Sequence, residues 1–224
     1  MPIFNAPILK IDVAETRRYA GLKNAQNFDE KNIADACADA LLMLDVRGVW
    51  KIYDYDCESR VVKSEPEFLV EGASIVKHLT GCEKVACMAV TVGENVEREV
   101  TKNFSAGNYV ASVLLDAAAT AAVEQAADAL EKVIAREVAK ESFKMRWRFS
   151  PGYGDWNLDN QREFFKITGA AEIGMSLSSA LMLIPRKSVT AIIGLEKITA
   201  GKNFHSTKKT CANCGKIDCP ARNV

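Results

Sequence analysis

The sequence predicts an α+β fold: a single domain with a central, mainly antiparallel twisted sheet, flanked by helices that include one long alanine-rich helix. The chain has 224 residues, of which 48% are hydrophobic and 26% charged, and this suits one folded domain of above-average size. Helical and strand patterns follow one another without the regular alternation of a doubly wound sheet. Neither an internal repeat nor a linker precedes residue 198.

The first half of the chain mixes short strands and helices. Residues 8–13 predict a strand, followed by a turn of helix around 15–19. Residues 29–46 predict a helix, because Asp29 can cap its N-terminus, apolar side chains recur at helical spacing and Gly48 follows its end. The other elements predicted here are a strand at 49–55, a helix at 73–80 and an apolar central strand at 84–92.

The second half begins with the longest predicted element, an alanine-rich helix at 109–140. Residues 143–149 then alternate as Phe-Lys-Met-Arg-Trp-Arg-Phe, which is typical of a half-exposed strand. The predicted elements that follow are a turn at 150–156, a helix at 158–168, and strands at 176–184 and 188–195 hinged at Pro185. Because the composition becomes polar and basic from residue 199, we expect a domain at 1–198 and a tail at 199–224.

Charge and composition exclude several classes of function. Lys+Arg and Asp+Glu both number 29, so neither nucleic acid nor an anionic membrane is expected as a partner. No uninterrupted apolar run reaches the roughly 18 residues that span a bilayer. The N-terminus Met-Pro-Ile-Phe-Asn-Ala-Pro lacks the features of a secretion signal, which favours a cytoplasmic location. Two histidines are too few for a multi-histidine catalytic metal site.

The seven cysteines are an odd number, which argues against a disulfide framework in a chain without a secretion signal. Cys37 shares a helical stripe with Ile33 and Leu41, and Cys87 lies in an apolar strand. Both are therefore expected to be buried small hydrophobic residues rather than ligands.

Three further cysteines gather in the tail. Cys211, Cys214 and Cys219 lie within nine residues, a spacing that can wrap one metal ion, with His205 as a candidate fourth ligand. Pro220 follows the last cysteine, and a Cys-Pro that closes a short Cys-x2-Cys run also resembles iron–sulfur segments. Zinc, an iron–sulfur cluster and a tail with free thiols all remain open alternatives.

The segment 148–156, Arg-Phe-Ser-Pro-Gly-Tyr-Gly-Asp-Trp, carries the most chemical information. Pro151 and Gly152 suit a type II turn, because proline fixes φ at the first central position and glycine supplies a positive φ at the second. Gly152 and Gly154 have no Cβ, so a ligand could lie against the backbone.

Two side chains of this segment suit a charged ligand. The planar fork of Arg148 can hold a carboxylate in two parallel hydrogen bonds. Tyr153 offers a hydroxyl and an aromatic face that can sit near a cation. Together they suit a zwitterionic amino acid with an additional positive centre. The alternative is a structural tight turn with a solvent-facing arginine, since Pro-Gly turns are common.

Arg-x-x-x-Gly-Tyr at a strand end resembles the S-adenosylmethionine-binding signature of the activation domain of cobalamin-dependent methionine synthase. Helix 158–168, the stretch Ile-Gly-Met-Ser-Leu-Ser-Ser-Ala-Leu-Met at 173–182 and the strand at 185–194 follow in the family's order. The resemblance covers residues 80–195 and is strongest at 146–194. The form Arg-Phe-Ser-Pro-Gly-Tyr-Gly-Asp-Trp is similar to that of stand-alone members from anaerobic bacteria.

The resemblance implies a set of binding residues. Arg148 would hold the carboxylate of S-adenosylmethionine, Ser150 and Gly152 would contribute backbone contacts, and Tyr153 would pack near the sulfonium. Glu124 is a further candidate, because the family has a glutamate on the long helix that precedes the signature.

The helix at 109–140 carries a polar stripe, which we infer from spacing alone. The members, four residues apart, are Ser112, Asp116, Thr120, Glu124 and Asp128. Such a stripe is usually the solvated side of a helix, and the less common alternative is that it lines a polar pocket.

Two departures from the family's pattern limit what the resemblance implies. The family has a ligand-contacting aspartate in an N-terminal Asp-Trp segment, which this chain lacks, so we do not assign that role to Asp12. The family also has tyrosines in the loop that corresponds to 196–204, where this chain has none. How the adenosine half would be held is therefore not predicted.

The resemblance implies that the chain is the activation subunit of a cobalamin-dependent methionine synthase and does not turn over alone. It would dock over the partner's cobalamin-binding domain and present the sulfonium methyl group to cobalt, after cob(II)alamin takes an electron from a flavodoxin-like donor. Catalysis would then be mainly positioning. Two alternatives stay open: reactivation of another corrinoid methyltransferase, and a redox- or metal-sensing binding protein that uses the cysteine tail.

Overall fold

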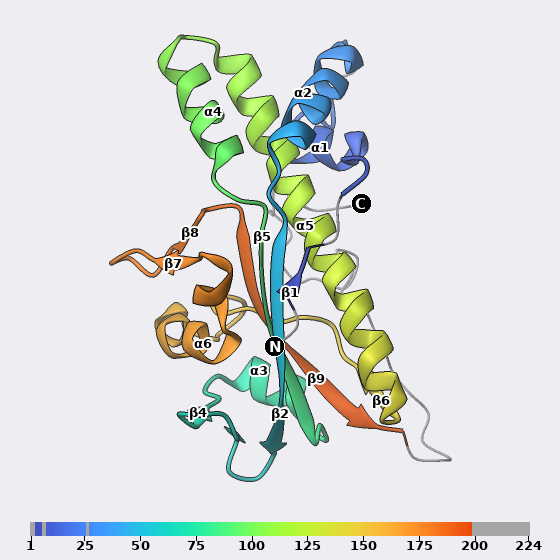
Figure 1. Cartoon of the computed structure of the whole chain (residues 1–224), viewed down its shortest axis with the longest axis vertical. Coiled ribbons are helices and arrows are strands. Elements are labelled where there is room, and N and C mark those ends of the chain that lie inside the picture. Colours follow the sequence, from blue (N-terminus) through green and yellow to red (C-terminus); the bar gives the residue numbers. More distant parts are fainter. Residues whose placement is uncertain (1–2, 6–7, 26, 199–224) are drawn as a thin grey trace.

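The computed structural model describes residues 3–5, 8–25 and 27–198 and confirms the α+β prediction. Its central sheet has seven strands in the order β4-β3-β2-β5-β9-β6, with β1 paired to β2, and all these pairs are antiparallel (Figure 1). The strands are β1 (Ile3–Phe4), β2 (Arg47–Asp56), β3 (Val61–Val62), β4 (Phe68–Leu69), β5 (Lys84–Thr91), β6 (Phe143–Met145) and β9 (Ser188–Lys197).

Helices cover both faces of the sheet. The α-helices are α1 (Val13–Tyr19), α2 (Glu30–Met43), α3 (Ala73–Leu79), α4 (Asn95–Ser105), α5 (Tyr109–Lys140) and α6 (Gln161–Thr168). Two short 3₁₀ segments, η1 (Leu158–Asn160) and η2 (Ala170–Ile173), flank α6, and a small hairpin of β7 (Ser176–Leu177) and β8 (Leu183–Ile184) precedes β9.

The two faces of the sheet build separate cores because side chains alternate along a strand. On β5, Met88 and Val90 pack in the core that contains α5, whereas Val85 and Cys87 pack in the core beneath α3 and α6. Since β5 is covered on both faces, its continuous apolar sequence is that of a central strand, as predicted.

Helix α5 links the sheet to a helical lobe. Its lower part lies along the sheet, and its upper part extends beyond the sheet among α1, α2 and α4 (Figure 1). Alanines fill the contact face: Ala118, Ala122 and Ala126 are fully buried. The helix is long and apolar enough to cross a membrane by length and composition, but most of that stretch is buried inside the protein, as in a core helix.

The N-terminal strand predicted at 8–13 is wrong. These residues form no strand, and Leu9 is 85% exposed. Asp12 instead caps α1, since its carboxylate accepts hydrogen bonds from the N–H groups of Ala14 and Glu15 at 2.8 and 3.1 Å. The first strand in the described residues is β1, which the sequence analysis did not identify.

The helix predicted at 29–46 is capped by Asp29 as expected but ends at Met43. Gly48 does not stop it, because this glycine lies within β2. A Cβ at Gly48 would lie 3.0 Å from Leu130 of α5 and 3.1 Å from Phe4 of β1. Glycine is therefore required there by close packing of the strand rather than by the end of a helix.

Two other predicted strands are shorter in the structure. Strand β6 ends at Met145, although the Arg146 N–H still donates to the Gly194 carbonyl of β9 at 2.8 Å. The chain pairs with β9 again at Phe149, opposite Ile192. The strand predicted at 176–184 is the β7–β8 hairpin, whose turn is closed by hydrogen bonds between Ser178 and Met182. Helix α4 and strands β3 and β4 were not predicted.

Candidate functional site

The turn after β6 has the predicted type II form. Gly152 has φ +90°, and the Tyr153 N–H donates to the Ser150 carbonyl at 3.1 Å, which closes the turn across Pro151. The Gly152 N–H donates to the carbonyl of Trp156 at 2.7 Å. The turn is thus fixed by its own backbone, which leaves its side chains to face neighbouring elements.

Asp155 fixes this turn to a second element. Its carboxylate accepts hydrogen bonds from the N–H groups of Ala73 and Ser74 at 2.8 and 2.9 Å, at the start of α3. Gly72, the residue before α3, has no side chain with which to cap it, so Asp155 provides the cap from a distant part of the chain. The hydrogen bonds from Ser74 and Ala73 lower the pKa of Asp155 below its ordinary value.

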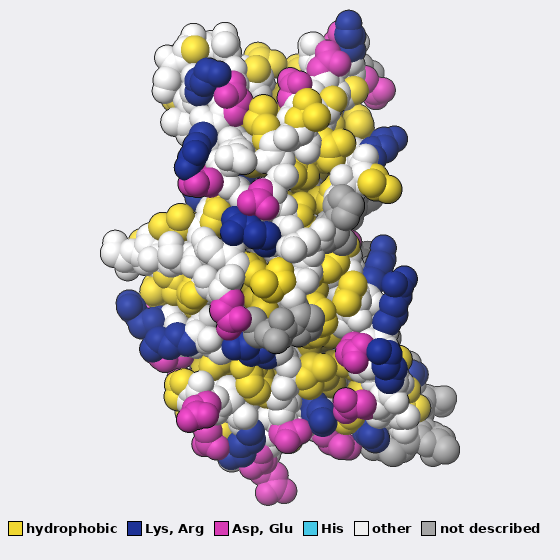
Figure 2. Space-filling view, in the orientation of Figure 1, with side chains coloured by type: hydrophobic (Ala, Val, Ile, Leu, Met, Phe, Trp, Pro, Cys, Tyr) yellow, Lys and Arg dark blue, Asp and Glu magenta, His cyan; other side chains and the backbone are white. Residues whose placement is uncertain are grey.

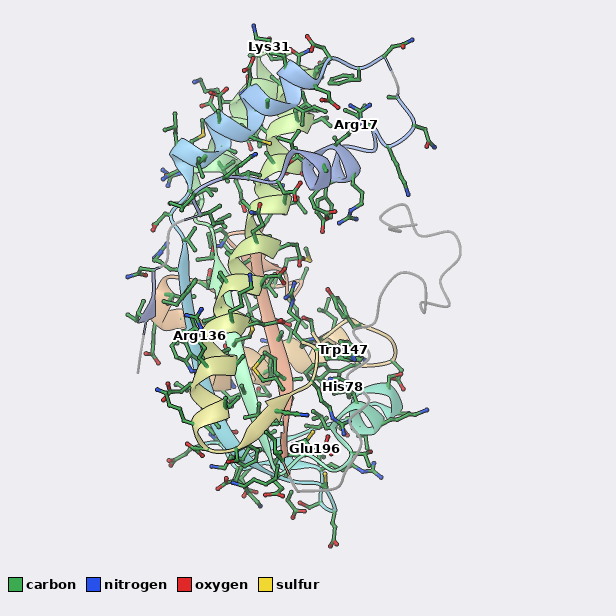
Figure 3. All side chains as sticks on the ribbon, turned by 90° about the vertical axis from the view of Figure 1, so that its right-hand side faces the viewer. Arg17, Lys31, His78, Arg136, Trp147 and Glu196 are labelled. Atoms are coloured by element: carbon green, nitrogen blue, oxygen red, sulfur yellow. The ribbon has the colours of Figure 1, made fainter. Side chains whose placement is uncertain are left out.

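The aromatic residues around Arg148 direct its side chain toward α5. Trp147 and Phe149 both pack against His78 of α3, with ring centroids 4.2 and 5.6 Å from the imidazole. Figure 3 shows Trp147 beside His78. Neighbouring residues of an extended segment point to opposite sides. Arg148, which lies between the two aromatics, therefore points away from α3.

The Arg148 guanidinium lies among three carboxylates of α5. Its Nη2 donates to Glu124 Oε2 at 2.6 Å, and its Nη1 donates to Asp128 Oδ1 at 2.6 Å and Glu131 Oε1 at 2.8 Å. The three acids share one face of the helix because they lie four and seven residues apart. The arginine is not solvent-facing, since its side chain is only 20% exposed.

Burial and charge act on Arg148 in opposite directions. Burial lowers the pKa of Arg148, but the three carboxylates, Glu131 foremost, outweigh it and raise this pKa above its ordinary value. The guanidinium therefore stays charged, and the cluster of three acids and one arginine keeps a surplus of negative charge.

Tyr153 lies between this cluster and a cavity. The residue is 54% exposed, and burial of the remainder together with the nearby Glu124 carboxylate raises the pKa of its hydroxyl. Tyr153 and Ser150 line a cavity of about 220 Å³. The cavity is also lined by Gln161 of α6, Met182 of the hairpin and Thr190 of β9. Gln161 donates to Thr190 at 2.7 Å, which joins two of these walls.

The structure therefore brings the predicted site residues together in two groups. Arg148 and Glu124 form an ion pair, and Ser150 and Tyr153 share the cavity wall. Gly152 is exposed beside them and, within the described part of the chain, is not among the residues that line the cavity. Its N–H is already used within the turn, so only its carbonyl and Cα could face a ligand.

The polar stripe of α5 receives a second cation. Lys187, the residue before β9, lies 2.8 Å from Asp116 and donates to Thr120 at 2.8 Å. The stripe is partly exposed: Ser112 is buried and donates to the Val100 carbonyl at 2.9 Å, whereas the side chains of Asp116 and Glu124 are 45% and 38% exposed. It also binds side chains from the sheet edge. It is thus neither fully solvated nor closed off.

Sequence reasoning missed Glu131 and Lys187 as members of this site. Glu131 could have been found, because it lies seven residues after Glu124 and thus on the same helix face. Lys187 gave no such signal, since its contact with Asp116 depends on how β9 runs past α5.

The N-terminal segment also reaches this part of α5. Gln125, next to Glu124, accepts from the Asp12 N–H at 2.9 Å and donates to the Lys10 carbonyl at 2.9 Å. Tyr19 of α1 lies near enough that the Glu124 carboxylate contributes, after burial, to raising the pKa of its hydroxyl. The carboxylate of Asp12 is occupied in capping α1.

The predicted metal ligands Cys211, Cys214 and Cys219, with His205, lie outside the described residues, as does the predicted tail. The division into a domain at 1–198 and a tail at 199–224 stays a prediction. Within the described ranges, no group of three or more His, Cys, Asp or Glu side chains is arranged to hold a metal ion. Cys37 and Cys87 are buried, as predicted.

The fold resembles that of a solved protein. The crystal structure of the MetH reactivation domain bound to AdoHcy matches with a TM-score of 0.59 and 13% sequence identity. The match covers 95% of this chain and 83% of that chain. No protein-family profile matches the sequence, and no curated protein matches it. At 13% sequence identity, this structural similarity establishes that the two proteins share a fold, and nothing beyond it.

Proposed function

We propose that this chain binds S-adenosylmethionine and acts as a separate activation subunit for a cobalamin-dependent methionine synthase. The observation that carries the proposal is the Arg148–Glu124 pair beside the cavity of Tyr153, in a fold shared with a reactivation domain that was solved with AdoHcy. The fold alone does not assign the ligand, so the proposal depends on these side chains.

The ion pair suits the amino-acid end of the ligand. A zwitterion brings one carboxylate and one ammonium group, and these can replace the two partners of the Arg148–Glu124 pair. Arg148 would then hold the carboxylate, and Glu124 would hold the ammonium. Both protein charges keep an opposite charge during this exchange, which limits the cost of breaking a partly buried pair.

Tyr153 suits the sulfonium. Its ring is half-exposed next to the Glu124 carboxylate, and an aromatic face beside an acidic group attracts a cation. The surplus of carboxylates around Arg148 adds to this attraction.

The cavity suits part of the rest of the ligand. At about 220 Å³ it is smaller than the roughly 300–1,000 Å³ of typical small-molecule sites, so it would enclose only a portion of the adenosine half. The remainder would lie in the open space above the turn, where Gly152 presents no side chain.

Activation would require a partner, because the described residues offer positioning groups rather than redox chemistry. The partner's cobalamin would supply the cobalt that, after one electron from a flavodoxin-like donor, takes the methyl group while the ligand sulfur keeps the electron pair of the broken bond. Arg148, Glu124 and Tyr153 would hold the ligand so that its methyl group faces the partner.

A transfer assay tests this function. The chain is mixed with a cobalamin-bearing methionine synthase fragment that lacks its own activation domain, a one-electron reductant and methyl-labelled S-adenosylmethionine. We expect label on the cobalamin only when all components are present, and loss of label with Arg148→Ala. The same assay with another corrinoid protein tests the alternative partner. Label that appears equally without the chain would contradict the proposal.

A further inference from the structure

A second surface lies at the far end of α5, away from the ligand site. Helices α2, α4 and α5 enclose a groove of about 610 Å³ whose floor includes Ala36, Leu114 and Leu115. Two apolar residues at the start of α5 line the groove and are exposed to solvent: Tyr109 is 58% and Val110 60% exposed. Figure 2 shows hydrophobic side chains gathered between α4 and α2 in this part of the molecule.

Acidic side chains form the rim of this groove. Asp35 and Asp39, one helical turn apart on α2, line one side, and Glu99 of α4 lines the other. Glu99 is paired with Lys102 at 3.1 Å, whereas the two aspartates have no ion-pair partner among the described residues. The groove lining contains no lysine or arginine within that same part of the chain.

A groove with an apolar floor and carboxylates at its rim favours a ligand that has an apolar face flanked by positive charges. We propose that this groove binds an amphipathic helix of a partner protein, whose apolar face covers Leu114, Val110 and Tyr109 and whose flanking lysines or arginines pair with Asp35 and Asp39. Helix-in-groove recognition uses this combination of apolar anchors and complementary charge. An acidic helix or an anionic lipid surface would be repelled by the same rim.

The groove lies far enough from the ligand site for both to be occupied at once. Leu115 and Glu124 lie on one continuous helix, about 13 Å apart along its axis from the rise per residue. A single helix, about 10–12 Å across, would fit within this distance and leave the Arg148 region open. The groove can therefore tether a partner without covering the ligand site, and this inference does not depend on which ligand that site binds.

A designed peptide tests the proposal. The probe is a fluorescent helical peptide of leucine and lysine with all leucines on one face, and its match has glutamate in place of every lysine. By anisotropy, we expect the lysine peptide to bind at least about tenfold more tightly than the glutamate peptide, with an affinity that falls as salt rises. Binding should weaken several-fold in Asp35→Asn/Asp39→Asn, and by about tenfold in Val110→Asp.

The control is Leu69→Asp, which places a charge on a similarly exposed residue of β4 at the other end of the molecule. Leu69→Asp should leave peptide binding unchanged. Val110→Asp and Leu69→Asp should both keep the wild-type melting temperature. The proposal is overturned if the two peptides bind equally, or if Val110→Asp binds like wild type. It is also overturned if sedimentation shows that the chain alone forms a dimer that Val110→Asp dissociates, because the groove would then serve a second copy.

Discussion

The Arg148 guanidinium donates to the Glu124 carboxylate across 2.6 Å, and this pair joins the segment after β6 to the long helix α5. The two residues lie 24 positions apart in sequence. Both were singled out from the sequence as candidate binding residues, Arg148 for the carboxylate of an amino acid and Glu124 as a further candidate, and the structure joins them in one ion pair.

The first prediction concerns Glu124→Gln, which keeps the shape of the side chain and removes its charge. If Glu124 holds the ligand ammonium, affinity for S-adenosylmethionine falls about tenfold or more, as expected for a lost charged hydrogen bond. Because the Glu124 carboxylate also raises the pKa of Tyr153, the variant should lower this pKa. Calorimetry measures the affinity, and ultraviolet titration of the phenol measures the pKa. An unchanged affinity with a lowered pKa would place Glu124 near Tyr153 but outside the ligand site.

The second prediction concerns the choice between ligands. S-adenosylmethionine carries one positive charge more than AdoHcy, so the acid surplus around Arg148 should favour it. Glu131→Gln removes one of these charges and should reduce the ratio of the two affinities by about two- to fivefold, the effect of a charge several ångströms away in a partly solvated site. The control is Glu137→Gln on the same helix, whose carboxylate pairs with Lys140 instead. An equal ratio in wild type and Glu131→Gln would contradict the prediction.

The third prediction concerns Asp155 and pH. Its pKa is lowered in the folded chain, so the stability that it contributes is present above the pKa of an unfolded aspartate, near 3.9, and is lost as pH falls through the lower folded value. Asp155→Ala should therefore unfold at lower denaturant concentration than wild type at pH 7. This difference should narrow when the pH falls below about 4. Denaturation at a series of pH values measures this difference in stability, with Asp159→Ala as the control. A difference between wild type and Asp155→Ala that stays constant with pH would exclude the capping role.

The fourth prediction concerns Gly152→Ala. The φ of +90° is unfavourable for alanine, whereas the new Cβ would lie at an ordinary 3.6 Å from Leu158. Strain rather than a clash should therefore lower the free energy of unfolding by about 1–2 kcal/mol. Asparagine tolerates positive φ better, so Gly152→Asn should lose less. Urea denaturation tests both variants, and equal stability of alanine, asparagine and glycine would show that the turn is not held in this conformation.

Local chemistry made much of the fold predictable. The Asp29 cap, the alanine-rich α5 and the Pro-Gly turn each depend on residues close together in sequence, and the structure confirms all three. The predictions were wrong where contacts between residues distant in sequence determine the local structure. Gly48 resembles a helix stop in sequence, but its role is set by Leu130 and Phe4, which approach it only in the folded chain.

The same distinction applies to the candidate site. Arg148, Ser150 and Tyr153 were identified from one short motif, and Glu124 from the long helix. Helical spacing places Asp128 and Glu131 on the same face of α5 as Glu124, but it does not show that all three contact Arg148, because this depends on the angle at which the turn meets α5. Nor could the sequence show that Asp155 caps α3, since the two lie more than 80 residues apart.

The most direct test of the account is calorimetric binding of S-adenosylmethionine to the wild-type chain, Arg148→Ala and Arg148→Lys. The control is Arg162→Ala, at an exposed arginine of α6. Wild type and Arg162→Ala should bind alike, and Arg148→Ala should weaken binding by about 2–3 kcal/mol because the ligand carboxylate loses its partner. Arg148→Lys should recover only part of this loss, since lysine cannot form two parallel hydrogen bonds. Equal affinities for wild type and a folded Arg148→Ala would contradict the account.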